Sequence, residues 1–123
     1  MSPAIGVETP MTQSRTRQRQ SAKIVDAVQR LIPKAEEAEL FLKALANAHR
    51  LLVLCELLKG EACVTELQNA VGLSQSSLSQ HLARLRQDRL VKTRRESRTI
   101  YYSLADDRVR RMIELLHDIF CAS

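Results

Sequence analysis

The chain has 123 residues, a length typical of one domain, and its 45% hydrophobic content is sufficient for a buried core. That core must be mainly aliphatic, because the chain has two Tyr, two Phe and no Trp, and this favours helices over a β-sandwich or barrel. The net charge of +5 favours a polyanionic partner, and no run of about 18 uncharged apolar residues is present that could span a membrane.

Residues 1–20 are polar, contain Pro3 and Pro10, and end in the alternating basic sequence RTRQRQ. Such a composition predicts a disordered tail, which either solubilises the chain or contacts DNA phosphates through its arginines. The N-terminus also lacks the apolar stretch of a secretory signal. We therefore expect a cytoplasmic protein with its three cysteines as free thiols, and one folded domain over residues 21–123.

Apolar residues at helical spacing predict three helices in the first half of the chain. The first, AKIVDAVQRLI, is expected to end or break at Pro33, and KAEEAELFLKALA follows with its acidic residues early. The third, NAHRLLVLCELLKG, is expected to begin after an Asn47 cap and to end at Gly60. Its predicted buried face is formed by Leu51, Leu54, Cys55 and Leu58.

The next segment is typical of a helix-turn-helix. The short helix CVTELQNAVG ends at Gly72, and a brief turn leads to a helix capped by Ser74 that starts with small polar residues. The second helix of such a pair enters the DNA major groove, where Gln and Ser can bond to base edges. The candidate DNA-binding residues in this helix are Gln75, Ser76, Ser77, Ser79, Gln80, His81 and Arg84. The alternative is an ordinary pair of surface helices.

The sequence LVKTRRESRTIYYSL alternates between apolar and polar residues and predicts a two-stranded hairpin around the turn RESR. Residues 84–98 carry a net charge of +5, which equals the charge of the whole chain. We expect Arg94, Arg95 and Arg98 of the hairpin to reach DNA phosphates or the minor groove, although a solvated basic face is the simpler reading.

A last helix, DDRVRRMIELLHDIFC, is expected to be capped by Asp106. Its apolar stripe comprises Val109, Met112, Ile113, Leu116, Ile119 and Phe120. This stripe is wider than one small domain covers, so we expect a second copy of the chain to pack on it. The alternative is that the stripe packs wholly within its own chain.

From about residue 35 to residue 121 the chain resembles the ArsR family of winged helix-turn-helix repressors. The segment LSQSSLSQHLARLR followed by LVKTRRESRTIYYSL carries the resemblance. The resemblance implies a mainly α fold with a small β-hairpin wing and a homodimer built through the first and last helices. It also implies a transcriptional regulator that binds an inverted-repeat operator in double-stranded DNA.

Neither metal site known in that family is complete in this sequence. One site needs Cys-x-Cys at the start of the short helix CVTELQNAVG, whereas here Thr65 stands two residues after Cys63, where the second thiolate is needed. The site in the last helix needs Asp-x-His early and His-x-x-His or His-x-x-Glu late. Here Arg108 and Val109 stand where the early histidine is needed, and Phe120 lies three residues after His117. We therefore expect no metal and no cofactor. A metal site made from the remaining two cysteines and one further ligand stays an alternative.

The sequences LLVLCELL and LLHDIFCAS resemble the persulfide-sensing branch of the family, which is BigR/SqrR/HlyU-like. Carried over to this chain, the resemblance implies that Cys55 and Cys121 form a dithiol that senses reactive sulfur species. A (poly)sulfide bridge between them would release operator DNA. The alternatives are that Cys55 is a core residue in a metal-responsive or anti-repressor-type regulator, or that the chain is a thiol enzyme. Catalysis is disfavoured because Cys55 lies mid-helix among leucines.

Overall fold

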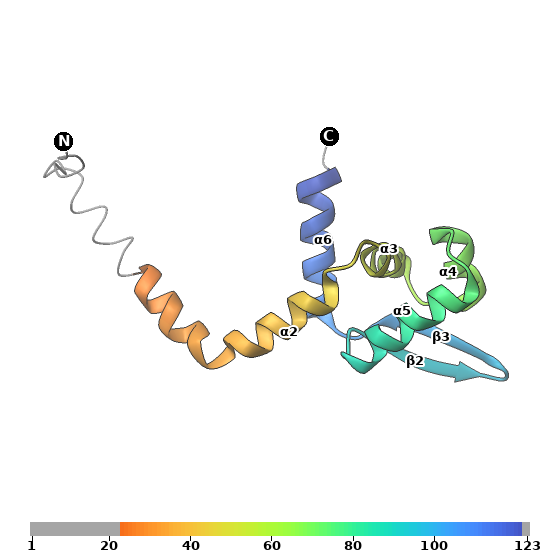
Figure 1. Cartoon of the computed structure of the whole chain (residues 1–123), viewed down its shortest axis with the longest axis horizontal. Helices are drawn as coiled ribbons and strands as arrows, with labels where there is room; N and C mark the ends of the chain where they lie inside the picture. The colour runs from red at the N-terminus through yellow and green to blue at the C-terminus, as the bar shows by residue number, and fades with distance from the viewer. Residues whose placement is uncertain (1–22, 122–123) are drawn as a thin grey trace, which may run out of the picture. The chain divides into compact units, whose positions relative to one another are not determined.

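A computed structural model describes residues 23–121, and these form helices with one small antiparallel sheet (Figure 1). Residues 23–31 are α-helical. The elements that follow are η1 (Ile32–Lys34), α2 (Ala35–Leu45), α3 (Ala48–Glu56), η2 (Leu57–Lys59), β1 (Ala62–Cys63), α4 (Val64–Val71), α5 (Gln75–Gln87), β2 (Val91–Glu96), β3 (Thr99–Leu104) and α6 (Asp107–Cys121). The mainly α fold with a β-hairpin wing is confirmed.

The chain divides into two compact units, the second of which begins at Leu40. In the first unit the α-helix ends at residue 31, and Pro33 lies at the start of the short 3-10 helix η1. Proline lacks the N–H that an α-helix needs at this point, so the predicted end of the helix is correct. Helical geometry resumes at once in α2, so no loop separates the two segments. The predicted tail, residues 1–20, lies outside the described residues.

The core of the second unit is built from aliphatic side chains. Helix α3 contributes Val53 and Leu54, which are fully buried, and the half-buried Leu51, Cys55 and Leu58 pack against them. The remaining fully buried large side chains include Leu57, Leu67, Leu78, Leu82, Leu85, Leu90 and Val109. The Asn47 side chain caps α3 by accepting the Arg50 backbone N–H at 3.0 Å, as the sequence predicted. A core of this kind follows from the helical spacing of leucines.

The sheet has three strands in the order β1-β3-β2, whereas the sequence predicted only the β2–β3 hairpin. The missed strand, β1, pairs Ala62 with Tyr102 and Cys63 with Tyr101. Two residues are too few to show an alternating pattern, and the sequence analysis had placed Cys63 in the helix that follows. The hairpin itself is confirmed, and its register places Thr93 opposite Tyr102.

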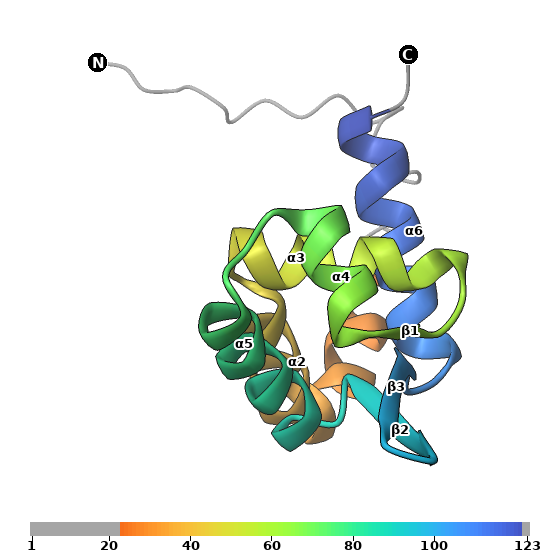
Figure 2. The same cartoon turned by 90° about the vertical axis from the view of Figure 1, so that its right-hand side faces the viewer.

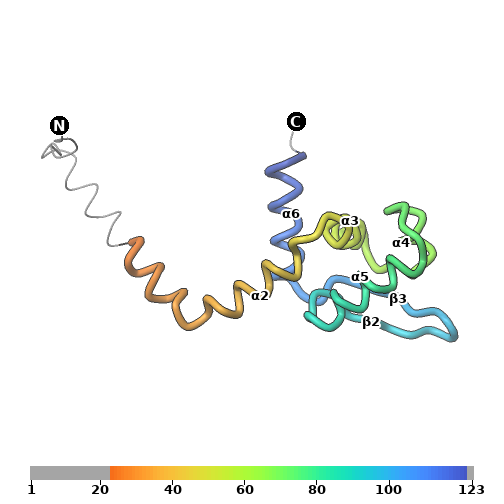
Figure 3. Tube along the Cα trace, in the orientation of Figure 1, coloured from red at the N-terminus to blue at the C-terminus, as the bar shows by residue number. Residues whose placement is uncertain are grey.

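Helix α6 begins as predicted, because the Asp106 side chain accepts the Val109 backbone N–H at 3.1 Å. Val109 and Ile113 are buried, whereas Ile119 and Phe120 near the end of the helix are 60% and 79% exposed. Figure 2 shows α6 continuing past α3 and α4 toward the C-terminus. The hairpin tip lies away from this end of α6 (Figure 3). None of the helices within residues 23–121 is long and apolar enough to cross a membrane.

Candidate nucleic-acid interface

Helices α4 and α5 form the expected helix-turn-helix. Helix α4 ends at Gly72, whose left-handed φ of 72° suits glycine and turns the chain sharply. Two residues later the Ser74 hydroxyl accepts the Ser77 backbone N–H at 3.2 Å and caps α5. A short polar connection between two helix ends thus fixes where α5 begins.

One face of α5 is buried and the other faces solvent. Leu78, Leu82 and Leu85 are 0–1% exposed and hold α5 against the core. Most of the predicted DNA-binding residues lie on the solvent face, namely Gln75, Ser76, Ser79, Gln80 and Arg84, and Ser77 is half-buried. Short polar side chains at the start of a helix allow it to sit deep in a DNA groove. Arg84 also pairs with Asp88 one turn later, with its Nε 2.5 Å from the carboxylate.

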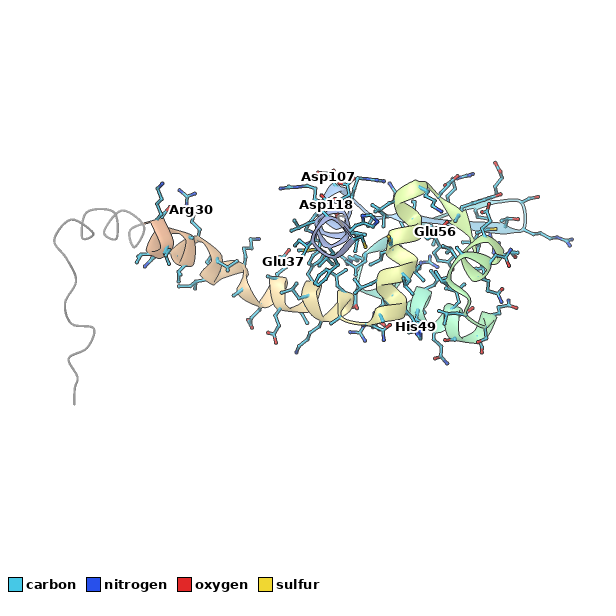
Figure 4. The ribbon with its side chains drawn as sticks, turned by 90° about the horizontal axis from the view of Figure 1, so that it is seen from above. Arg30, Glu37, His49, Glu56, Asp107 and Asp118 are labelled. Atoms are coloured by element: carbon cyan, nitrogen blue, oxygen red, sulfur yellow. The ribbon has the colours of Figure 1, made fainter. Side chains whose placement is uncertain are left out.

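His81 differs from the other candidates on α5 because its ring contacts α3. The ring is half-buried and stands edge to face against His49, with 5.5 Å between ring centroids. Figure 4 shows His49 and Glu56 at opposite ends of α3. Burial lowers the pKa of His81, and the nearby His49 and Arg50 lower it further. The structure therefore places His81 at the joint between α3 and α5.

The three predicted arginines of the hairpin are exposed but have different surroundings. Arg94 binds the Glu61 carboxylate through two nitrogens and contacts Glu96 through the third. Arg95 and Arg98 form no ion pair with any carboxylate in the part of the chain that the structure describes. The two unpaired guanidinium groups are thus available to an external anion.

Two residues that position the interface were missed by the sequence analysis. Arg50 is buried, and its Nε donates to the Ala44 carbonyl at 2.7 Å, which ties α3 to the end of α2. Glu61 binds Arg94 across a separation of 33 residues. Neither contact has a signal in the sequence, because an isolated charge gives no indication of a partner distant in the chain.

The three cysteines are free thiols in different environments. Cys55 is half-buried on α3 and packs against the core, and α3 packs against α6. Cys121 is exposed at the last residue of α6. Cys63 lies at the start of α4, where its backbone N–H donates to the Glu66 carboxylate at 2.9 Å. The structure thus brings together the helices that carry Cys55 and Cys121 and gives Cys63 a capping position.

Within residues 23–121 no three His, Cys, Asp or Glu side chains are grouped so that they could hold a metal ion. His117 is exposed on α6.

Comparison with known proteins agrees with this geometry. The family described as "Bacterial regulatory protein, arsR family" matches residues 47–93, which run from the α3 cap into β2. The transcriptional activator HlyU of Vibrio cholerae serotype O1 is 49% identical over 94 residues, covering 76% of this chain and 87% of that protein. The nodulation protein NolR of Rhizobium meliloti is 51% identical over 90 residues, covering 71% and 74% of the two chains.

Solved structures share the fold as well as the sequence. The structure of the transcriptional repressor BigR from Xylella fastidiosa superposes with a TM-score of 0.73 at 36% sequence identity. The match covers 77% of this chain and 97% of that one.

Proposed function

Because the chain belongs to the ArsR family and is a DNA-binding transcriptional regulator of its HlyU/BigR-like branch, we propose that it is a homodimeric repressor that senses reactive sulfur species. In this proposal α5 reads an inverted-repeat operator, and a bridge between Cys55 and Cys121 releases it. The observation that carries the DNA-binding part is the exposed polar face at the start of α5, held in place by three buried leucines.

Base readout is assigned to the first turns of α5. Gln75 can bond to adenine through two atoms, and the serines nearby can donate to or accept from several bases. Arg95 and Arg98 of the wing supply contacts to the sugar-phosphate backbone, which position the protein without reading sequence. The exposed, unpaired state of these two arginines within the described residues supports this role.

The base-readout assignment is tested by comparing Gln75→Ala with Gln87→Ala, which changes an exposed glutamine at the far end of the same helix. Binding is measured on an operator selected from random duplexes and on a scrambled duplex. Gln75→Ala should weaken operator binding by about 1–3 kcal/mol and leave the scrambled duplex unchanged. An equal loss on both duplexes would contradict base readout.

A second copy of the chain is proposed to cover the exposed end of α6. Ile119, Phe120 and Leu115 are each more than half exposed there. A groove of about 570 Å³ includes Leu115 in its lining, together with Phe41 of α2, Met112, and the charged α6 residues Arg108, Arg111, Glu114 and Asp118. A two-fold dimer would bury these side chains and set two copies of α5 about one DNA turn, or roughly 34 Å, apart.

The thiol pair is supported by the packing of α3. Helix α3 contacts α6, which carries Cys121, and also contacts α5, the helix that is proposed to read DNA. A covalent bridge from Cys55 to α6 would therefore act on the helix against which α5 is packed. For the bridge to release DNA, it must stabilise an arrangement in which the two copies of α5 fit the operator less well.

The proposed sulfur chemistry proceeds by exchange and needs no separate oxidant. A cysteine thiolate attacks the outer sulfur of a hydropersulfide RSSH, forming a protein persulfide and releasing the thiolate of RSH. When both Cys55 and Cys121 carry persulfides, one attacks the other, which forms a trisulfide bridge and releases H2S. A bridge lengthened by sulfur can join thiols whose α-carbons lie beyond the limit of about 7 Å for a direct disulfide.

The sensor assignment is tested with Cys55→Ala and Cys121→Ala, and with Cys63→Ala as the matched cysteine control. Operator affinity is measured before and after treatment with a hydropersulfide. We expect the treated wild-type protein and Cys63→Ala to lose affinity, whereas the other two variants keep it. Loss of affinity in all three variants would rule out the Cys55–Cys121 pair.

Activation is the second candidate function, because the HlyU relative is named a transcriptional activator. The same α5 surface would then displace another DNA-binding protein rather than block transcription itself. A purified transcription assay that contains only operator DNA, polymerase and this protein separates the two. Repression lowers the transcript in that assay, whereas displacement leaves it unchanged.

A further inference from the structure

Arg94 stands apart from the other wing arginines because each of its three guanidinium nitrogens donates a hydrogen bond within the chain. Its Nε donates to one Glu61 carboxylate oxygen at 3.1 Å, and its Nη2 donates to the other. Its Nη1 donates to Glu96 at 3.4 Å, and the guanidinium carbon lies 4.8 Å from the centre of the Tyr101 ring. Two-point binding of a carboxylate is the strong, directional mode of arginine pairing.

The sheet register shows what this cluster joins. Tyr101 of β3 lies opposite Arg94 of β2 on one side and opposite Cys63 of β1 on the other. Glu61 immediately precedes β1, which leads directly into α4. The Glu61–Arg94 pair therefore closes over β3 and connects the wing to the start of the helix-turn-helix.

We propose that Arg94 is a positioning residue that anchors the wing against the start of α4 through Glu61 and Tyr101, and that it does not bind DNA phosphate. The sequence predicts that Arg94, Arg95 and Arg98 all contact DNA, and this proposal leaves that role to Arg95 and Arg98 alone. The inference rests on the proposed function only in assuming that the wing meets DNA.

Competition for the same atoms supports the assignment. Two-point binding of a phosphate through Nε and Nη2 would use the nitrogens that already hold the Glu61 carboxylate, so the carboxylate would be displaced and would repel the phosphate. Arg95 is the next residue along the strand, so its side chain projects from the opposite face of the sheet. Because successive side chains of a strand point to opposite faces, Arg94 can anchor the wing while Arg95 stays available to DNA.

Hydrogen exchange tests the anchoring without DNA. Glu61→Gln, Arg94→Gln and the double variant are compared with Arg95→Gln, which changes an exposed arginine outside the cluster. We expect faster exchange of the wing amides, residues 91–104, in each cluster variant and no further increase in the double variant. Wild-type exchange rates in both single variants would overturn the proposal. Circular dichroism of each variant confirms that the helices remain folded.

Salt dependence of DNA binding tests the absence of a phosphate contact. Loss of one phosphate contact reduces the slope of log affinity against log salt concentration by about 0.9. Arg94→Gln should weaken binding with the wild-type slope, and Glu61→Gln should weaken it similarly. A slope reduced in Arg94→Gln, or tighter binding by Glu61→Gln, would overturn the proposal. If Arg95→Gln and Arg98→Gln both keep the wild-type slope, the proposed contact between the wing and DNA phosphates is wrong. The hydrogen-exchange result would still show whether Arg94 anchors the wing.

Discussion

His49 of α3 and His81 of α5 stand edge to face, with 5.5 Å between ring centroids and 62° between ring planes. Arg50, the residue after His49, adds a positive charge close to His81. The pair joins the helix that is expected to contact DNA to the helix that carries Cys55. A change in the protonation of His81 would therefore act on the packing of α5 against α3, which is the packing that a Cys55 bridge is proposed to change.

We expect this joint to make the protein less stable in mild acid. Burial, His49 and Arg50 lower the pKa of His81, so below its ordinary value of about 6.5 the unfolded chain binds more protons than the folded chain. Above about pH 6.5, His81 is neutral in both states and does not change the free energy of unfolding. As the pH falls from about 6.5 toward the lowered pKa of the folded state, the free energy of unfolding decreases.

The pH prediction is checked by denaturant unfolding at several pH values. His81→Gln should lose part of the acid-dependent fall in stability. Gln87→Ala, which changes an exposed side chain without a titratable group at the end of α5, is the control and should keep the full wild-type pH dependence. The same pH dependence in His81→Gln as in the wild type would show that His81 does not account for it.

The Ser74 cap should stabilise α5 measurably. Its hydroxyl accepts the Ser77 backbone N–H, which would otherwise lack a helical partner. Ser74→Ala is expected to reduce the free energy of unfolding by about 1 kcal/mol. Ser76→Ala, in the exposed first turn of the same helix, is the control and should change it by less than about 0.5 kcal/mol. Equal effects of the two substitutions on the free energy of unfolding would show that the Ser74 cap does not stabilise α5.

The exposed end of α6 should control assembly. Phe120→Glu places a charge where the proposed dimer buries an aromatic ring, so we expect a shift toward monomer in sedimentation equilibrium. Thr65→Glu, on the exposed side of α4, is the control and should leave the mass unchanged. A wild-type mass for Phe120→Glu would place the dimer surface elsewhere or indicate a monomer.

The sequence predicted those features that depend on neighbours along the chain. The spacing of Leu78, Leu82 and Leu85 located the buried face of α5, and the Ser74 and Asp106 caps were predicted correctly. His81 lies between these leucines on the helix surface, so its contact with α3 follows from the same periodicity, although the sequence analysis grouped it with the groove residues.

Features that depend on distant contacts were not predictable in this way. Strand β1 exists because two residues pair with β3, and neither residue carries a pattern of its own. The Glu61–Arg94 pair joins residues 33 positions apart, so charge counting treated Arg94 like its neighbours. Pairings across a sheet depend on the folded register rather than on local composition.

Peptide mass spectrometry of the reduced protein after exposure to a hydropersulfide or to hydrogen peroxide, with operator affinity measured on the same samples, tests the central claim most directly. We predict that only the hydropersulfide links the peptides of Cys55 and Cys121 through added sulfur, and that affinity falls in proportion to the linked fraction. An unlinked pair, or a linked protein that keeps its affinity, would contradict the sulfur switch and leave Cys55 as a residue of the core.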